Sequence, residues 1–319
     1  MLQLKQKGYE PDVIFAHPGW GETLYVKNVF PKARLIHFCE WYYRSQGADM
    51  NFDAEFPDDF NAGARVETWN ALHALNLVNC DAAVTPTQWQ LKQHPEIFHS
   101  KIKVIHEGVD MSVLYPDAQA ELTLPDGFHA RAGMPIITYV ARQLEPYRGF
   151  HSFMRALSII QKVLPDCHTI IIGGDDVSYG SKPRDAANFR EKMLKEVRID
   201  ASRTHFLGQV PYDMYRKVLQ VSRVHTYLTY PFVLSWSMLE AMAMGCLVVG
   251  SRTSPVEEVI RDGENGLLAD FFDPQDIAEK VVLCLREPMS ELRAQARADV
   301  LARYDFAQAE PAFRALLSG

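Results

Sequence analysis

Two polar positions early in the chain each end an apolar, β-branched run. His17 ends the run over residues 11–17, and Glu40 ends the run over residues 33–40. An imidazole at a strand end can donate a hydrogen bond to a sugar hydroxyl or carry a proton, although a lone histidine is more often structural. Trp41 and Tyr42 follow Glu40, and aromatic rings pack against the apolar faces of sugars. The segment therefore fits a carbohydrate surface, and it fits a packing cluster between domains equally well.

Two arginines follow the run over residues 135–142. Arg142 and Arg148 are six positions apart on one strand-to-helix turn. Their guanidinium groups can converge on a diphosphate and neutralise the charge that grows on a departing phosphate. The alternative is a pair of solvated arginines. Gly174 ends a further run, over residues 168–174, where it lets a ligand or another backbone approach closely or simply makes a turn.

A third feature is a helix start that follows the run over residues 224–230. Ser235 or Ser237 can cap a helix that carries Glu240 about one turn in. Free N–H groups at a helix start bind anions, and such sites lie at the carboxyl ends of parallel strands. There Glu240 could hold vicinal hydroxyls such as those of a ribose. The alternative is a plain amphipathic helix with Glu240 exposed.

Strand-like and helical patterns alternate along the chain, which predicts βαβ units on parallel sheets. The sequence predicts two doubly wound α/β domains: a short first domain over residues 1–115 and a complete second domain over residues 116–289. A linker over roughly residues 115–135 precedes the strands of the second domain. A helical segment over residues 290–319 is expected to pack back on the first domain. The predicted strands are residues 11–17, 33–40, 81–87 and 101–108, then 135–142, 168–174, 203–209, 224–230, 246–252 and 266–270. The predicted helices are residues 61–79, 149–164, 188–199, 212–222, 235–245, 254–263 and 273–285.

Composition excludes several classes of protein. The 319 residues are 47% hydrophobic and 23% charged, which is typical of globular proteins and not of disordered or coiled-coil chains. The formal charge of −7 argues against a dedicated nucleic-acid binder. Five scattered cysteines fit reduced core residues rather than disulfides or a metal site. No apolar run is long enough for a membrane span, and the first ten residues lack a signal core. Five acids between residues 48 and 60 are expected to form a solvated loop.

Taken together, these segments resemble the GT-B glycosyltransferases of family 4, which use nucleoside diphosphate sugars and retain configuration. The resemblance covers nearly the whole chain and is strongest between Val104 and Asp273. VIHEGVD at residues 104–110 is similar to the family's IPNGVD linker. SPVEEVIRDGENGLLADFFDP at residues 254–274 is similar to the family's GGxxEhhxxGxxGhLhxxxd segment. HPGWGE and EPYRGF look like a bacterial branch associated with cell-surface polysaccharide synthesis. The resemblance implies a GT-B fold with two Rossmann-like domains facing a cleft.

Site residues carry over from the family motif by motif. Arg142 and Arg148 fall where the family binds the diphosphate, although one residue further apart than is usual. Glu240 matches the second glutamate of an E-x7-E motif that holds the donor ribose, whereas Phe232 stands at the first. His17 matches a histidine that approaches the transferred sugar. By this resemblance the catalytic residues are His17, Arg142 and Arg148; the donor is also bound by Gly174, Val210, Leu234, Ser235, Trp236, Ser237 and Glu240; and the acceptor is bound by Glu40, Trp41 and Tyr42.

The implied reaction needs no metal, no other cofactor and no obligatory covalent intermediate. Its substrates are a nucleotide-sugar donor and a saccharide or lipid-linked saccharide acceptor, with no nucleic acid. The expected location is cytoplasmic, with peripheral contact at the inner face of the membrane left open. Two alternatives are a nucleotide-sugar-binding protein that needs a partner for catalysis, and another GT-B activity such as an epimerase or phosphorylase.

The length of the first domain departs from the family. A run that is normally in mid-domain, residues 11–17, lies near the start of this chain. The resemblance therefore implies that the usual N-terminal segment is missing, which would leave a sheet edge and apolar surface for an oligomer or a partner chain to cover.

Overall fold

The computed structural model describes residues 1–319, apart from the side chain of Phe60, and divides them into two compact units. Unit 1 comprises Met1–Gly108, Pro231–Val233 and Phe306–Gly319. Unit 2 comprises Val109–Tyr230 and Leu234–Asp305. Each unit is described by itself below.

Unit 1 is built on a four-stranded parallel sheet in the order β1-β2-β3-β4. Ala16 of β1 pairs with His37 of β2, so the residues that follow these two strands emerge at the same edge of the sheet. The elements of unit 1 are α1 (Leu2–Gln6), β1 (Val13–Ala16), α2 (Val26–Val29), β2 (Arg34–Phe38), α3 (Phe60–Asn79), β3 (Ala82–Thr85), α4 (Gln88–Gln93), η1 (Glu96–Phe98), β4 (Ile102–Val104) and α12 (Phe306–Ser318).

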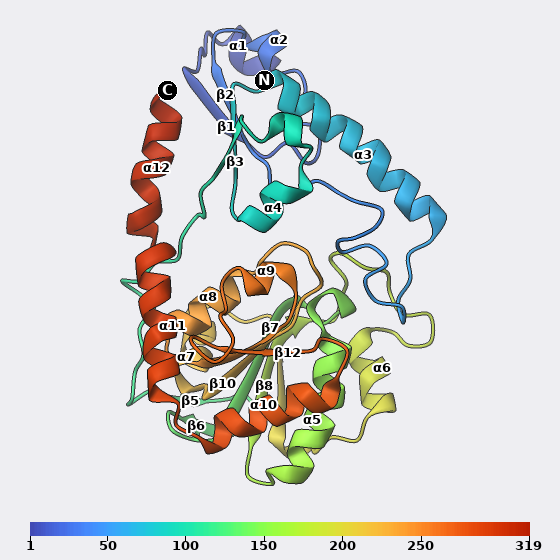
Figure 1. Cartoon of the computed structure of the whole chain (residues 1–319), viewed down its shortest axis with the longest axis vertical. Coiled ribbons are helices and arrows are strands. Elements are labelled where there is room, and N and C mark those ends of the chain that lie inside the picture. Colours follow the sequence, from blue (N-terminus) through green and yellow to red (C-terminus); the bar gives the residue numbers. More distant parts are fainter. The chain divides into compact units, whose positions relative to one another are not determined.

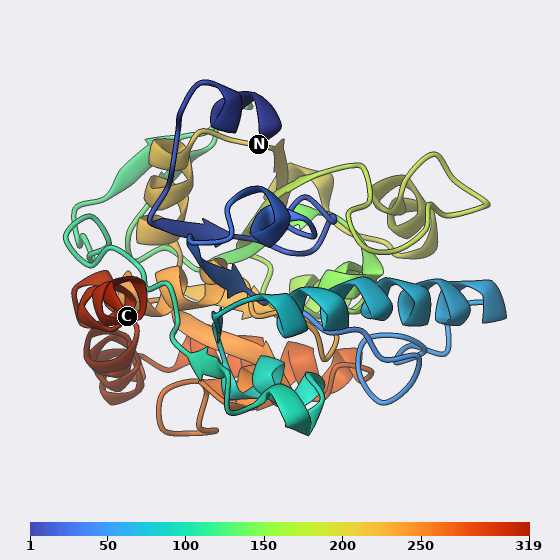
Figure 2. The same ribbon diagram turned by 90° about the horizontal axis from the view of Figure 1, so that it is seen from above.

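Helices cover both faces of this sheet. On one face Leu77 of α3 packs with Leu35 and Ala83. On the other, Leu316 of α12 packs with Ile36 and Val84. α3 is one uninterrupted helix in both views (Figure 1, Figure 2), and the Asp59 side chain caps its first turn by accepting a hydrogen bond from the Ala62 amide. The central strands β2 and β3 are therefore covered on both faces, as in most parallel sheets, whereas Val13 and Phe15 of the edge strand β1 remain exposed.

Unit 2 is built on a six-stranded parallel sheet in the order β12-β11-β10-β7-β8-β9, beside a two-stranded antiparallel hairpin, β5-β6. Its strands are β5 (Glu121–Thr123), β6 (His129–Arg131), β7 (Ile136–Gln143), β8 (His168–Gly174), β9 (Thr204–Gly208), β10 (Val224–Tyr227), β11 (Leu247–Ser251) and β12 (Leu267–Ala269). Its helices are η2 (Pro146–Arg148), α5 (Phe150–Val163), α6 (Phe189–Glu196), η3 (Ala201–Arg203), α7 (Tyr212–Val221), α8 (Trp236–Ala243), α9 (Ser254–Glu257), α10 (Pro274–Arg286) and α11 (Ser290–Arg303).

The helices of unit 2 lie in two layers. α5 and α10 pack together on one face (Figure 1), where Tyr139 of β7 stacks on Phe153 at 4.6 Å between ring centroids. α7, α8 and α11 contribute to the core of the other face. Gly149 is the N-cap residue of α5. Its φ is +67°, and a Cβ added to it would lie only 2.4 Å from the Leu228 Cβ, so this position requires glycine. The residue that follows η2 therefore packs closely against Leu228, the residue that follows β10.

All ten runs that were expected to be strands form strands, and the parallel α/β class is confirmed. The linker was not expected to contain structure, yet it holds the β5-β6 hairpin. α9 is shorter than the predicted helix over residues 254–263. The Asn265 side chain accepts a hydrogen bond from the Arg261 amide and donates one to the Val259 carbonyl, so these backbone groups bond outside the helix.

The unit boundary and the C-terminal segment differ from the predicted domains. Unit 1 gives way to unit 2 at residue 108, because the Val109 amide donates a hydrogen bond to the Tyr304 carbonyl within unit 2. Of the segment over residues 290–319, α11 packs on α8 in unit 2, and only α12 belongs to unit 1.

Two expectations about side chains have opposite outcomes. The five cysteines are free and buried, as expected. The acidic segment is not uniformly solvated, since Asp49 and Asp53 are buried. No helix in the described part of the chain is both long and apolar enough to cross a membrane.

Candidate active site

Arg148 is the central charged residue at the carboxyl ends of the unit 2 strands. It lies in η2 after β7, and only 8% of its surface is exposed. Its guanidinium donates a 2.8 Å hydrogen bond to Thr229 Oγ1 and contacts the Tyr227 hydroxyl at 3.4 Å. The Tyr179 ring covers it, 5.5 Å from the ring centroid. These contacts hold the guanidinium in one orientation.

The start of α8 is connected to the same hydroxyl. The Ser235 amide donates a 2.7 Å hydrogen bond to the Tyr227 hydroxyl, so one phenol joins Arg148 to the backbone that begins α8. Ser235 is the N-cap residue of α8, and its side chain accepts from the Ser237 amide. Leu234 is half-buried, Ser237 is buried and Trp236 is 52% exposed. The sequence-predicted helix start and Arg148 are therefore brought together.

Arg142 and Gly174 occupy different environments from Arg148. Arg142 is exposed near the end of β7, whereas Arg148 is buried. A Cβ on Gly174 would lie 2.3 Å from Gln143 Oε1, so glycine there is explained by a neighbouring strand. Val210 lies half-buried between β9 and α7 and packs on the unit 2 core.

Glu240 is buried in α8, contrary to the alternative in which it is solvent-exposed. Its carboxylate accepts hydrogen bonds from the Tyr212 hydroxyl at 2.8 Å and the Tyr215 hydroxyl at 2.5 Å. Burial, together with the Glu240 charge, raises the pKa of both phenols, which therefore remain donors.

Glu145 is a completely buried carboxylate that the sequence analysis did not single out. It accepts hydrogen bonds from the backbone amides of Ser178 at 3.0 Å, Tyr179 at 3.2 Å and Gly180 at 3.1 Å. These three bonds fix the loop after β8 and thereby place the Tyr179 ring over Arg148. Glu145 thus supports the arginine indirectly, through the loop that carries Tyr179.

Replacing Glu145 with alanine is expected to lower the free energy of unfolding by about 2–3 kcal/mol, the usual value of hydrogen bonds to a charged group. The loop amides would turn to water, so hydrogen exchange at residues 178–180 should become fast. Mass spectrometry of exchange together with urea unfolding measures both effects. Glu196→Ala, which removes a surface ion pair with Arg155, serves as the control and should cost less than about 1 kcal/mol. Unchanged exchange at 178–180 in Glu145→Ala would contradict this role.

In unit 1, His17 and Glu40 lie together at the carboxyl ends of β1 and β2. The distance between His17 Nε2 and Glu40 Oε2 is 3.4 Å, and the two side chains are 39% and 48% exposed. The Gly19 amide donates to His17 Nδ1 at 3.0 Å, which leaves the ring hydrogen on Nε2, facing the carboxylate. The pair is open to a ligand and has a defined tautomer.

Polar side chains of α3 hold the two loops that carry this pair. Trp69 Nε1 donates to the Gly19 carbonyl at 3.0 Å. Asn70 accepts from the Tyr43 amide at 3.0 Å and donates to the Tyr43 carbonyl. A further amide from α4 reaches the Glu40 carbonyl, as Gln90 Nε2 donates to it at 2.7 Å. The long helix therefore positions the loops as well as covering the sheet.

The aromatic residues after Glu40 pack inside unit 1. Trp41 is 5% exposed and meets Phe232 edge-on at 4.9 Å between centroids. Tyr42 lies between the rings of His73 and His94 at 6.2 and 5.7 Å. Trp41 therefore packs against Phe232 within unit 1 and does not form an open carbohydrate surface. The same contact shows what Phe232 does at the position of the first motif glutamate: it fills a buried contact with Trp41.

Glu107 is a further carboxylate that sequence reasoning missed. It follows β4, its Oε2 atom is buried without a hydrogen-bond partner among the described residues, and burial followed by the Glu40 charge raises its pKa. The only sequence signal was its place at the end of a predicted strand. Tyr212 and Tyr215 were also missed, although their spacing of three on a helix that follows Pro211 places them on one face.

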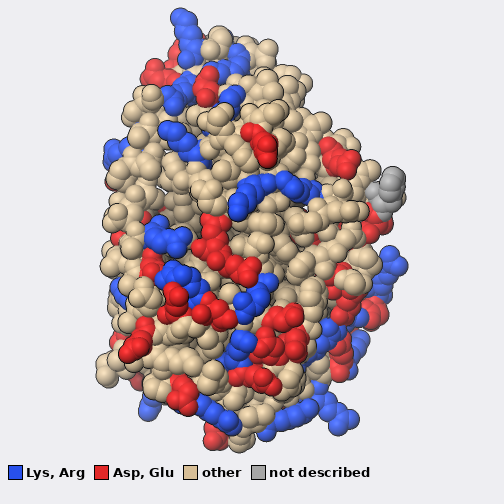
Figure 3. Space-filling view, in the orientation of Figure 1, with Lys and Arg blue, Asp and Glu red and all other residues tan. Residues whose placement is uncertain are grey.

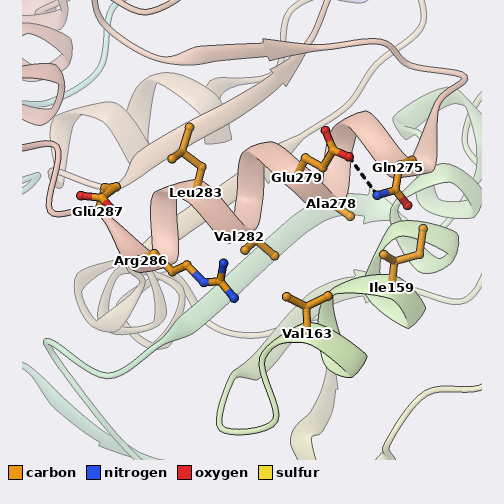
Figure 4. A pocket seen from close by; sticks show the side chains of 9 residues that line it. All are labelled: Ile159, Val163, Gln275, Ala278, Glu279, Val282, Leu283, Arg286 and Glu287. Carbon is orange, nitrogen blue, oxygen red and sulfur yellow. Dashed lines mark hydrogen bonds between the residues drawn. The ribbon is translucent and has the colours of Figure 1, made fainter.

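A hollow on unit 2 is lined by none of the site residues that the sequence predicts. This hollow of about 450 Å³ lies between α5 and α10 (Figure 4), lined by Ile159, Val163, Gln275, Ala278, Glu279, Val282, Leu283, Arg286 and Glu287. On the face drawn in Figure 3, acidic and basic side chains of unit 2 are interspersed. The described residues contain no group of three or more His, Cys, Asp or Glu side chains arranged for a metal ion.

Comparison with known proteins identifies the family of this sequence. Residues 1–114 match the model of the glycosyl transferase family 4 group, and residues 134–287 match that of the glycosyl transferases group 1. A D-inositol 3-phosphate glycosyltransferase from Nocardioides sp. is 24% identical over an alignment of 214 positions that covers 62% of this chain and 44% of that protein. Spore coat protein SA of Bacillus subtilis is 26% identical over 57% of this chain and 48% of its own length. The chain thus matches less than half the length of these curated relatives.

Solved structures show the same fold. Sucrose-phosphate synthase from Thermosynechococcus elongatus matches with a TM-score of 0.72 at 19% identity, covering 99% of this chain and 76% of that one. Anabaena HepE in complex with UDP-glucose matches with a TM-score of 0.70 at 17% identity, covering 99% and 81%. Two family models that together span most of the sequence, and a fold shared with these proteins, place this chain among the GT-B glycosyltransferases.

Proposed function

We propose that this chain binds a nucleoside diphosphate sugar at the carboxyl ends of the unit 2 strands and transfers the sugar to a hydroxyl of a saccharide or lipid-linked saccharide. The observation that carries the proposal is the buried Arg148 guanidinium, joined through the Tyr227 hydroxyl to the start of α8. A fixed cation beside helix N–H groups suits a diphosphate, because both stabilise negative charge. A solved protein with this fold binds UDP-glucose, which supports the same class of donor.

In this proposal the bond between the anomeric carbon and the diphosphate oxygen breaks while the acceptor oxygen bonds to the same face of the sugar, with retention of configuration. Arg148, Arg142 and the amides that begin α8 stabilise the departing diphosphate. Val210 lines the nucleobase side and Gly174 the diphosphate side. His17 meets the transferred sugar, and Glu40 with Tyr42 meets the acceptor. No metal is assigned a part.

The biological role that the sequence motifs favour is the synthesis of a cell-surface polysaccharide on the cytoplasmic side of the membrane. A second candidate is a nucleotide-sugar-binding protein that turns over only with a partner chain. Phe232 favours it, because an apolar ring packed on Trp41 takes the place of a carboxylate that contacts the donor sugar in the resembling family.

An assay of nucleoside diphosphate release tests the two candidates. The chain is incubated with UDP-, GDP- and dTDP-sugars, with and without a panel of saccharide acceptors, and in the presence of EDTA. The first candidate predicts acceptor-dependent release from one donor class that persists in EDTA. Binding of a nucleotide with no release on any acceptor would favour the second candidate, and the absence of both would reject the donor site.

A further inference from the structure

Glu240 is clamped by two phenols from the neighbouring helix. The Tyr212 hydroxyl donates to Glu240 Oε1 at 2.8 Å, and the Tyr215 hydroxyl donates to Glu240 Oε2 at 2.5 Å. Tyr215 is 8% exposed and Glu240 is 7% exposed, whereas Tyr212 is 50% exposed. One phenol of the clamp is therefore internal and the other lies at the surface.

Each carboxylate oxygen can accept more than the one hydrogen bond that the clamp supplies. A carboxylate has about four acceptor positions, and one phenol on each oxygen fills two of them. Two donors on different oxygens also fix the rotation of the carboxylate plane. Both oxygens therefore keep acceptor capacity, in a fixed orientation, for a pair of adjacent hydroxyls.

We propose that Tyr212 and Tyr215 are positioning residues that orient the Glu240 carboxylate to accept the 2′ and 3′ hydroxyls of a ribonucleotide, and so make the site select ribose over 2′-deoxyribose. The inference rests on the proposed function, because it takes the ligand to be the nucleotide of the sugar donor. The inference adds a preference for ribose over 2′-deoxyribose to that function, and it assigns this preference to two residues of α7. The mechanism is pre-organisation: the clamp orders the carboxylate before the nucleotide arrives.

A purely structural clamp would behave differently. The Tyr215 ring already packs in the unit 2 core, so its hydroxyl is not needed to fill space. Removing that hydroxyl would lower stability in either case. Only a positioning role would make the loss specific to nucleotides that carry a 2′ hydroxyl. The selectivity ratio between ribo- and deoxyribonucleotides is therefore the readout that separates the two roles.

The experiment is calorimetric titration of the full chain with UDP, 2′-deoxyUDP, GDP and 2′-deoxyGDP. The unmodified chain is expected to bind one ribonucleotide about tenfold more tightly than its deoxy form, as for one hydrogen bond to a charged group. Tyr215→Phe is expected to reduce that preference to about twofold or less, mainly through weaker binding of the ribonucleotide. Tyr212→Phe should reduce it in the same direction.

Two control variants match the clamp residues in burial and lie elsewhere in unit 2. Tyr304→Phe removes a hydroxyl from a side chain that is 7% exposed, and Tyr115→Phe removes one from a side chain that is 48% exposed. Both are expected to keep the full preference. In the Glu240→Gln background, Tyr215→Phe should change the preference no further, because the group it orients has lost its charge.

The outcomes separate the inference from the proposed function. Failure of the unmodified chain to bind any of the four nucleotides would overturn the donor site itself. Normal binding with an unchanged preference in both tyrosine variants would overturn the clamp alone. If Tyr215→Phe does not fold, Tyr212→Phe carries the test, since Tyr212 is half-exposed and is not part of the buried core. A larger preference for the ribonucleotide in Tyr212→Phe would also overturn the inference, because it would show that the Tyr212 phenol competes with the ribose for Glu240.

Discussion

Substitution of Arg148 by lysine is expected to lower kcat/KM for sugar transfer by about 100-fold or more, the usual cost of removing a preorganised group that stabilises transition-state charge. Lysine keeps the charge but loses the planar fork of donors. The guanidinium is held at once by Thr229, by the Tyr227 hydroxyl and by the Tyr179 ring. A flexible ammonium cannot reproduce all three contacts, so it would meet the diphosphate in many orientations.

Steady-state kinetics with the preferred donor measure this effect, with thermal unfolding as a check on folding. Arg142→Ala should also weaken the diphosphate interaction, but by less, because Arg142 is exposed and water screens its charge. Arg297→Lys is the matched control, since Arg297 is a half-buried arginine that bonds to the Leu114 and Ala243 carbonyls. An Arg148→Lys variant with the kcat/KM of the unmodified chain would refute the central place of Arg148.

Acidification from pH 6.5 to about pH 4 is expected to destabilise unit 1, and the loss of stability should begin above the pH range in which ordinary carboxylates titrate. Burial lowers the pKa of His37, His73 and His94 to about 4, from an ordinary value of 6.5. These rings bind protons in the unfolded chain at pH 5 but not in the folded one, so stability is fully present above pH 6.5 and is lost as the pH falls towards 4. At about 1.4 kcal/mol per pKa unit, each histidine accounts for about 3 kcal/mol over this range.

Urea unfolding followed by tryptophan fluorescence measures this loss, because Trp20, Trp41, Trp69 and Trp89 all lie in unit 1. His37→Leu provides the specific comparison. Both ring nitrogens of His37 lack hydrogen-bond partners in the described structure, so leucine removes a desolvated ring without breaking a bond. The variant should show a flatter decline between pH 6.5 and 4.5. Equal slopes for the two chains, or no decline at all, would contradict the assignment to buried histidines.

Much of the fold follows from local pattern. Short β-branched runs separated by amphipathic stretches predict parallel strands, and the pairing of β1 with β2 then brings His17 and Glu40 together. The features that the sequence did not predict depend on partners far along the chain. α9 is shortened by Asn265, and the three-residue strands of β5 and β6 are too short to show a period.

In the candidate site, too, features that depend on local spacing could be predicted from the sequence, and features that depend on distant residues could not. Ser235 and Glu240 could be placed on one helix from spacing alone. The burial of Glu240 could not, because it depends on Tyr212 and Tyr215 in a different helix. The role of Glu145 could likewise not be predicted from the sequence, because its three partners are backbone amides more than 30 residues away. The burial of Trp41 depends on Phe232, which is distant in sequence but belongs to the same unit.

Hydrogen exchange of the full chain with and without UDP or GDP tests the donor site most directly. Bound diphosphate should slow the exchange of backbone amides at residues 147–150 and 235–240, because these segments carry Arg148 and the start of α8. Segments of the α5-α10 hollow, such as residues 278–287, should exchange at the same rate with and without nucleotide. Protection confined to 147–150 and 235–240 is the result that the donor site predicts. Nucleotide binding that protects other segments and leaves these two unchanged would contradict it.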